Sequence, residues 1–167
     1  SAALAPAAAS ASAFSRAFAS AAFSRLSRAA FALISVGLNG CLYVPGWSTT
    51  MLKRFNSLDK EIAKKIVFLP PLDQNEYFGV LKRSDVVLDS TYFSGGVSSV
   101  EALSFGKPIV TWPNSPLGVS RVTNAYYHEM GILDCIAKSG EAYVQLAVRL
   151  GTDFNWRAQI ELKIKNK

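Results

Sequence analysis

Short apolar runs alternate with segments of helical spacing from Cys41 to the end of the chain. Four of these runs have the length and composition of buried strands; they cover residues Cys41–Val44, Ile66–Leu69, Val86–Asp89 and Ile109–Trp112. Glycine and proline residues bound the runs, and helical segments separate them. This alternation is typical of βαβ units, so the pattern predicts an α/β fold with a Rossmann-like parallel sheet and flanking helices.

The helical segments carry recognisable start and stop signals. A first one is expected within residues 50–65. Asp73 precedes the next, and Glu76 three residues later completes the outline of a capping box. Gly106 is placed to end a helix that starts near residue 98, and Pro108 prevents its continuation. Further helices are expected at residues 121–130, 140–150 and 153–165.

The first 40 residues differ in composition from the rest of the chain. They are almost entirely Ala, Ser, Phe and Arg, with no acidic residue. One interpretation is a transit-like segment that directs the protein to a plastid or mitochondrion. If the segment has no such role, the protein is expected to be cytosolic. Another is an alanine-rich helical arm that packs small side chains on a partner. The chain is therefore expected to consist of this N-terminal arm, residues 1–40, and one α/β domain, residues 41–167.

The formal charge of +6 does not indicate that the protein binds nucleic acid. All 12 acidic residues but only 13 of the 18 basic ones lie at or beyond Asp59, so that part of the chain is nearly neutral. Cys41 and Cys135 both lie in apolar surroundings, which is typical of buried free thiols. No uninterrupted apolar run of about 18 residues occurs, so no transmembrane segment is expected.

A glycine pair lies where the third expected strand leads into a helix. The segment "STYFSGG" places Ser94, Gly95 and Gly96 beyond the carboxyl end of that strand, where parallel sheets bind ligands. The first amides of the following helix would attract an anion, for which a diphosphate is the natural candidate. Glu101 could close a capping box on Ser98 or accept hydrogen bonds from sugar hydroxyls, and a purely structural turn explains the spacing equally well.

Two long segments resemble one enzyme family. "DVVLDSTYFSGGVSSVEALSFGKPIVTWP" and "SRVTNAYYHEMGILDCIAKSGEAYVQLAVRLGTDFNWRAQI" look like the C-terminal half of the catalytic region of O-linked N-acetylglucosamine transferases and their SPINDLY-like relatives. That family has the GT-B fold, in which two Rossmann-like halves face a cleft, and transfers a sugar from a nucleotide donor to Ser or Thr of proteins. The resemblance implies one half of a GT-B fold that binds a UDP-sugar, uses no metal or other cofactor, and has a protein acceptor or protein complex as partner.

The resemblance also implies a donor site. Matched by position, its residues are Pro71, Leu72 and Tyr77 beside the base, Ser94, Gly95, Gly96, Val97 and Ser98 in the diphosphate loop, Glu101 at the ribose hydroxyls, and Arg121 after the flexible loop. Arg121 has the alternative role of a salt bridge at the start of its helix. Val97 stands where family members carry a polar side chain, so one contact to phosphate or ribose is absent.

The matched segments supply only part of what sugar transfer requires. The family's C-terminal half opens with a strand and an Asn-x-x-Lys segment whose lysine contacts the diphosphate, and the sequence contains neither this segment nor the half with the acceptor cleft. We therefore expect the chain alone to bind a UDP-sugar without catalysing transfer, and we assign no catalytic residue. The alternative is an inactive glycosyltransferase-like domain that serves as a structural or accessory subunit of a larger complex.

Overall fold

The computed structural model describes residues 72–167, the segment 31–33 and a few positions between residues 53 and 70. The chain divides into two compact units, of which unit 1 comprises Ser1–Ser27 and Gly37–Leu72, and unit 2 comprises Arg28–Val36 and Asp73–Lys167. In the part of the chain so described, no helix is long and apolar enough to cross a membrane. The described strands all belong to unit 2.

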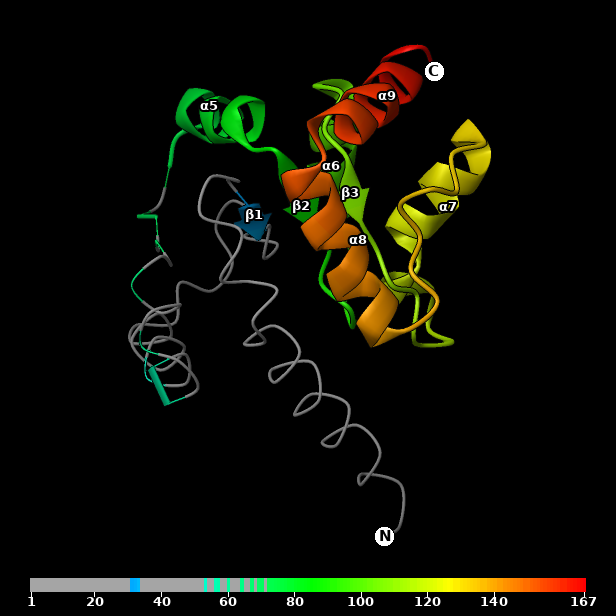
Figure 1. The fold of residues 1–167 in the computed structure, drawn as a ribbon, viewed down its shortest axis with the longest axis horizontal. Helices are drawn as coiled ribbons and strands as arrows, with labels where there is room; N and C mark the ends of the chain where they lie inside the picture. The colour runs from blue at the N-terminus through cyan, green and yellow to red at the C-terminus, as the bar shows by residue number, and fades with distance from the viewer. Residues whose placement is uncertain are drawn as a thin grey trace, which may run out of the picture. The chain divides into compact units, whose positions relative to one another are not determined.

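In the described part of unit 2, three short parallel strands form a sheet (Figure 1). They are β1 (Phe31–Leu33), β2 (Val86–Leu88) and β3 (Ile109–Val110), and they lie side by side in that order. β1 pairs with β2 residue for residue, and Val87 of β2 lies opposite Ile109 of β3. Every residue of β2 and β3 is buried, as expected for parallel strands covered on both faces.

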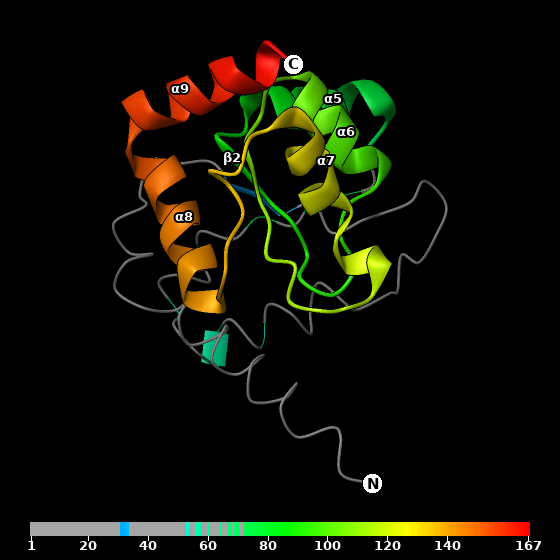
Figure 2. The ribbon, with the colours of Figure 1, turned by 90° about the vertical axis from the view of Figure 1, so that its right-hand side faces the viewer.

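Helices cover both faces of this sheet. They are α5 (Gln74–Arg83), α6 (Val97–Ser104), α7 (Val122–Met130), α8 (Gly140–Thr152) and α9 (Phe154–Lys165), with the short 3-10 helix η1 (Gly118–Ser120) before α7. Figure 2 shows α8 on one side of β2 and α5, α6 and α7 on the other, with α9 running across the top from α8 toward α6. α8 packs on β2 and β3, α6 packs on β3, and α9 contacts both α8 and α6.

The expected helix signals are confirmed. The backbone N–H of Glu76 donates to Asp73 Oδ1 at 2.8 Å, and the N–H of Asp73 donates to Glu76 Oε2 at 3.0 Å, which completes the capping box of α5. Gly106 after α6 and Gly131 after α7 have φ angles of 72° and 68°. Both glycines therefore adopt the left-handed conformation that ends a helix at low steric cost.

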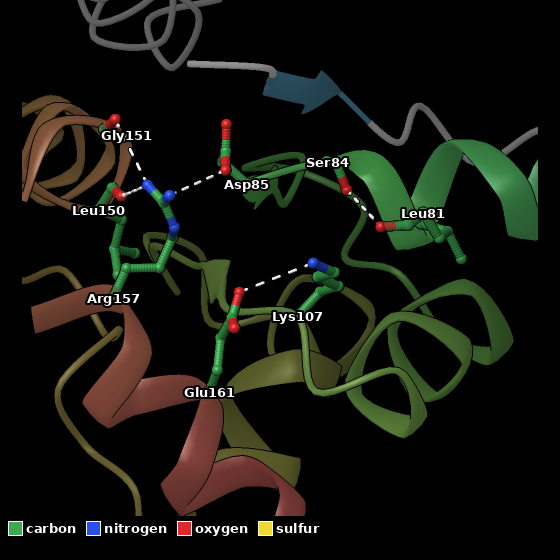
Figure 3. A network of polar contacts seen from close by, with 8 residues as sticks. All are labelled: Leu81, Ser84, Asp85, Lys107, Leu150, Gly151, Arg157 and Glu161. Atoms are coloured by element: carbon green, nitrogen blue, oxygen red, sulfur yellow. Dashed lines mark hydrogen bonds and ion pairs between the residues drawn. The ribbon is translucent and has the colours of Figure 1, made fainter. Parts of the chain in front are cut away.

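α9 covers the amino ends of β2 and β3 with two ion pairs (Figure 3). Nη2 of Arg157 lies 3.0 Å from Oδ1 of Asp85, which directly precedes β2. Nη1 of Arg157 donates to the carbonyl of Leu150 at 2.8 Å. One turn further along α9, Glu161 lies 3.7 Å from Lys107, two residues before β3. Because α9 occupies the amino ends of these strands, a ligand is expected at their carboxyl ends.

Two expectations about the first part of the chain differ from the structure. β1 lies inside residues 1–40, where a helical arm was expected, because pairing with β2 outweighs the helix propensity of its alanine-rich surroundings. The strand expected at Ile66–Leu69 is wrong at its two described positions, Val67 and Leu69, which belong to no strand. The strand expected at Cys41–Val44 and the remainder of the arm lie outside the described residues, so the boundary between residues 40 and 41 stays a prediction.

Candidate functional site

A buried carboxylate organises the loop that follows β2. Asp89 directly follows this strand and is 5% exposed. Its Oδ1 accepts a hydrogen bond from the backbone N–H of Gly95 at 2.8 Å, and its Oδ2 accepts from the hydroxyls of Ser94 and Thr111, each at 2.7 Å. Tyr143 of α8 donates to the Asp89 carbonyl at 2.8 Å. These donors explain how a charged side chain can be buried at this position, since a buried charge requires hydrogen-bonding partners.

Thr123 of α7 extends this network to α6. Its Oγ1 lies 2.8 Å from the hydroxyl oxygens of both Ser94 and Ser99, and its backbone N–H donates to Ser94 Oγ at 3.0 Å. The N–H of Ser94 donates to the carbonyl of Val119 in η1 at 2.8 Å. Ser94 is 2% exposed, so its side chain is engaged inside the fold and holds the loop in place.

α6 begins at Val97 without a side-chain cap. Gly96 is its N-cap residue, and among residues 72–167 no side chain accepts a hydrogen bond from the first amides of the helix. The capping box considered for Ser98 and Glu101 is not formed, because the helix begins one residue before Ser98. Ser98 Oγ is buried and has no hydrogen-bond partner in the described part of the chain. The positive end of the helix dipole thus meets no acidic side chain in the first turn.

The two glycines before α6 have different roles. A Cβ added at Gly95 would fall well inside contact distance of Ser99 Oγ and 3.0 Å from Ser98 Oγ, so the fold itself requires glycine there. A Cβ added at Gly96 would meet nothing within 4 Å. Gly96 therefore leaves open space beside the backbone at the start of the helix, where a ligand could approach closely.

Tyr77 of α5 lies next to Glu101 of α6. The phenol oxygen of Tyr77 is buried and has no hydrogen-bond partner among residues 72–167. Burial, followed by the charge of the neighbouring Glu101 carboxylate, raises the pKa of Tyr77 to about 12. The two side chains approach each other without forming a hydrogen bond of ordinary geometry, so the Glu101 carboxylate keeps its capacity to accept hydrogen bonds from a ligand.

The remaining expected site residues lie at the margin of this arrangement or outside it. Arg121 is the exposed N-cap residue of α7, and no ion pair of its guanidinium occurs within residues 72–167, so the salt bridge considered for it is not formed there. Val97 is 72% exposed at the start of α6. Pro71 lies outside the described residues and Leu72 belongs to unit 1, so a place beside the base stays a prediction for both.

Cys135 is a buried free thiol, as expected. Burial raises its pKa to about 12, which makes the thiol unreactive at neutral pH. Cys41 lies outside the described residues. Within those residues, no three His, Cys, Asp or Glu side chains gather in a way that could hold a metal ion.

The network of Asp89, Thr111 and Thr123 could not be identified from the sequence. The one available signal is Asp89 itself, a charged residue at the end of an otherwise apolar run. The hydroxyl groups that donate to it lie 5 and 22 residues away along the chain. A network of this kind has no characteristic spacing in sequence, so only the folded chain reveals it.

Comparison with known proteins identifies the relatives of this chain. The family model "Glycosyl transferase family 41" matches residues 41–167. The UDP-N-acetylglucosamine--peptide N-acetylglucosaminyltransferase of Caenorhabditis elegans is 33% identical over 100 residues, which are 60% of this chain and 9% of that protein. A mutant O-GlcNAc transferase of Thermobaculum terrenum has a similar structure, with a TM-score of 0.66 and 23% identity over 73% of this chain and 23% of that one. The chain therefore spans a small part of each relative, and the structural likeness shows the α/β fold.

Proposed function

Because the chain belongs to glycosyl transferase family 41, we propose that unit 2 is the donor-binding part of a protein O-glycosyltransferase. The donor is a UDP-sugar, and the complete enzyme transfers N-acetylglucosamine or a related sugar to Ser or Thr. The name of the Caenorhabditis elegans relative, which states both a UDP-sugar and a peptide, supports this choice of donor and acceptor. We propose binding and not turnover for this chain alone, because transfer also requires an acceptor hydroxyl held in line with the sugar.

The observation that carries this proposal is the uncapped start of α6. In the described part of the chain, no side chain accepts a hydrogen bond from its first amides, and open space lies beside Gly96. Unpaired N–H groups at a helix start, together with the positive end of the dipole, form an effective site for phosphate. The diphosphate of the donor would accept hydrogen bonds from these amides and take the place of the missing cap.

Tyr77 and Glu101 supply the proposed contacts to the nucleoside. The Glu101 carboxylate would accept hydrogen bonds from the two ribose hydroxyls, since a carboxylate has several acceptor positions and forms strong bonds with such donors. Tyr77 lies next to it, so its ring is placed to pack against a base attached to the same ribose. Phosphate, ribose and base would thus be held by neighbouring elements, α6 and α5.

Titration of the 167-residue chain with UDP and with UDP-N-acetylglucosamine tests this function. We expect saturable binding by calorimetry, and we expect Glu101→Ala to weaken it at least about tenfold because hydrogen bonds to a charged group are lost. Glu129→Ala is the matched control, since it removes an exposed acid from another helix, α7. The absence of heat at millimolar ligand, or an equal effect of the two substitutions, would contradict donor binding at this site.

A second candidate function is that of an accessory subunit without donor binding. The observation that favours it is the exposure of large apolar side chains around the candidate site: Tyr92, Phe93, Val97, Val100, Leu117 and Val119. Exposed apolar patches commonly contact other proteins. The same titration separates the two functions, because an accessory subunit predicts no binding of UDP.

A further inference from the structure

We propose that Asp89 is a positioning residue for the donor site, a role that rests on the proposed function. Asp89 lies inside the fold and is not expected to touch the nucleotide. Its carboxylate instead fixes the loop from which α6 starts, and thereby sets the direction in which the first amides of α6 point.

The carboxylate makes two kinds of contact. On the loop side it accepts from the N–H of Gly95 at 2.8 Å and from the hydroxyl of Ser94 at 2.7 Å. On the sheet side it accepts from the hydroxyl of Thr111, directly after β3, at 2.7 Å. The loop is therefore anchored to the carboxyl ends of two neighbouring strands through one side chain.

The contact with Gly95 determines the conformation of the glycine pair. Because the N–H of Gly95 donates inward to Asp89, the chain has to turn at Gly95 and Gly96 before α6 begins at Val97. The amides beyond this turn are the ones left without a side-chain acceptor. A hydrogen bond to an ionised carboxylate is stronger than one to a neutral group, so the charge of Asp89 makes this turn well defined.

The surrounding elements keep Asp89 itself in place. The hydroxyl of Tyr143 in α8 donates to the backbone carbonyl of Asp89 at 2.8 Å. The backbone N–H of Asp89 donates to the carbonyl of Val110 in β3 at 3.0 Å. The main chain of Asp89 is thus held independently of its side chain. A substitution that changes only the carboxylate should consequently release the loop and leave the sheet intact.

Asp89→Asn and Thr111→Val separate positioning from general stability. The Asp89→Asn variant replaces the charged acceptor of the Gly95 N–H by a neutral amide oxygen, which binds it more weakly. It also places an N–H₂ group where Oδ2 now accepts from two hydroxyls. Thr111→Val removes one hydrogen bond to the same carboxylate from the sheet side and leaves both loop contacts. Calorimetric titration with UDP, exchange of the Gly95 amide proton by NMR and the melting temperature are measured for each variant in the 167-residue chain.

We expect Asp89→Asn to weaken UDP binding at least about tenfold and to speed exchange of the Gly95 amide at least about tenfold. Thr111→Val is expected to lower the melting temperature, to leave UDP affinity within about twofold, and to leave Gly95 exchange unchanged. Wild-type affinity together with wild-type Gly95 exchange in Asp89→Asn overturns the proposal. Equal weakening of UDP binding by both variants also overturns it, because the loss of affinity would then result from a general loss of stability.

Failure of the wild-type chain to bind UDP would contradict the proposed function. The exchange measurement would then still decide the role of Asp89 in the loop. Faster Gly95 exchange in Asp89→Asn but not in Thr111→Val supports the anchoring role, and equal exchange in both variants overturns it.

Discussion

Single residues determine how the loop after β2 is built. A Cβ added at Gly95 would lie against the hydroxyls of Ser98 and Ser99, whereas a Cβ added at Gly96, or at Gly79 in α5, would meet no described atom within 4 Å. The glycines of this protein therefore differ in what an added methyl group would meet. Sequence alone does not reveal this difference, since each is simply a glycine near a helix.

Gly95→Ala is expected to lower the free energy of unfolding by about 1–3 kcal/mol, because the added methyl group overpacks a filled site. Gly79→Ala is the matched control. It places alanine inside α5 with open space around it, and should raise the free energy of unfolding by about 0.5–1 kcal/mol. Urea denaturation measures both, and a Gly95→Ala protein as stable as the wild type would show that the loop adapts.

At the scale of secondary-structure elements, α9 depends on its polar contacts with the amino end of the sheet. Arg157 joins α9 to Asp85 and to the last turn of α8, where it donates to the carbonyls of Leu150 and Gly151 (Figure 3). Its side chain is 13% exposed, so these contacts are largely shielded from water. These contacts stabilise the turn between α8 and α9. In this turn, the side chain of Asp153 caps α9 by accepting from the backbone N–H of Trp156.

Arg157→Met is expected to lower the free energy of unfolding by about 1.5–3 kcal/mol, since it removes charge-assisted hydrogen bonds to two carbonyls and to Asp85 in a largely shielded position. Lys163→Met removes an ion pair to Asp134 of similar length, 3.0 Å, on the exposed face of the same helix. Its expected cost is below about 1 kcal/mol. Equal losses for the two variants in urea denaturation would contradict the special role of Arg157.

Elements differ in how far the sequence predicts them. The helices of unit 2 were predicted because their signals are local: the capping box of Asp73 and Glu76 spans three residues, and Gly106 and Gly131 act at the helix end itself. β1 was not predicted, because its three residues become a strand only through pairing with β2, which lies more than 50 residues further along the chain.

The positions of the candidate site residues in the fold were predicted in part for a similar reason. The glycine pair before α6 and Glu101 inside it follow from spacing around a strand and a helix, whereas the binding of a donor by these residues stays a prediction. The start of α6 at Val97 excluded the capping box on Ser98, a shift of one residue that helix signals do not resolve. Asp89 was missed because its partners come from separate elements and the loop.

At the scale of the whole molecule, the buried titratable groups make the fold sensitive to alkali. Burial raises the pKa of Tyr77 and of Cys135 to about 12, and burial also raises the pKa values of Tyr127 and Tyr143. In the unfolded chain these groups return to ordinary values of 9 for the thiol and 10 for the phenols. The unfolded state therefore loses protons at lower pH than the folded state does.

The contribution of these groups to the free energy of unfolding is accordingly expected to be constant below pH about 9 and to fall as the pH rises toward 12. Each such group contributes a loss of up to about 1.4 kcal/mol per pH unit. Urea denaturation between about pH 7 and pH 11 measures the slope. Cys135→Ala should be less stable overall but show a shallower decline, and an unchanged slope would contradict the assignment of the thiol.

The position of β2 between two parallel neighbours has a practical consequence. Among the described residues, one side of its backbone pairs with the three residues of β1, which lie far upstream in the chain. A shortened chain that began after Leu33 would present a row of free amide and carbonyl groups along an apolar strand. An exposed edge strand of this kind pairs with strands of other molecules. We therefore expect β1 to protect the protein from self-association and precipitation.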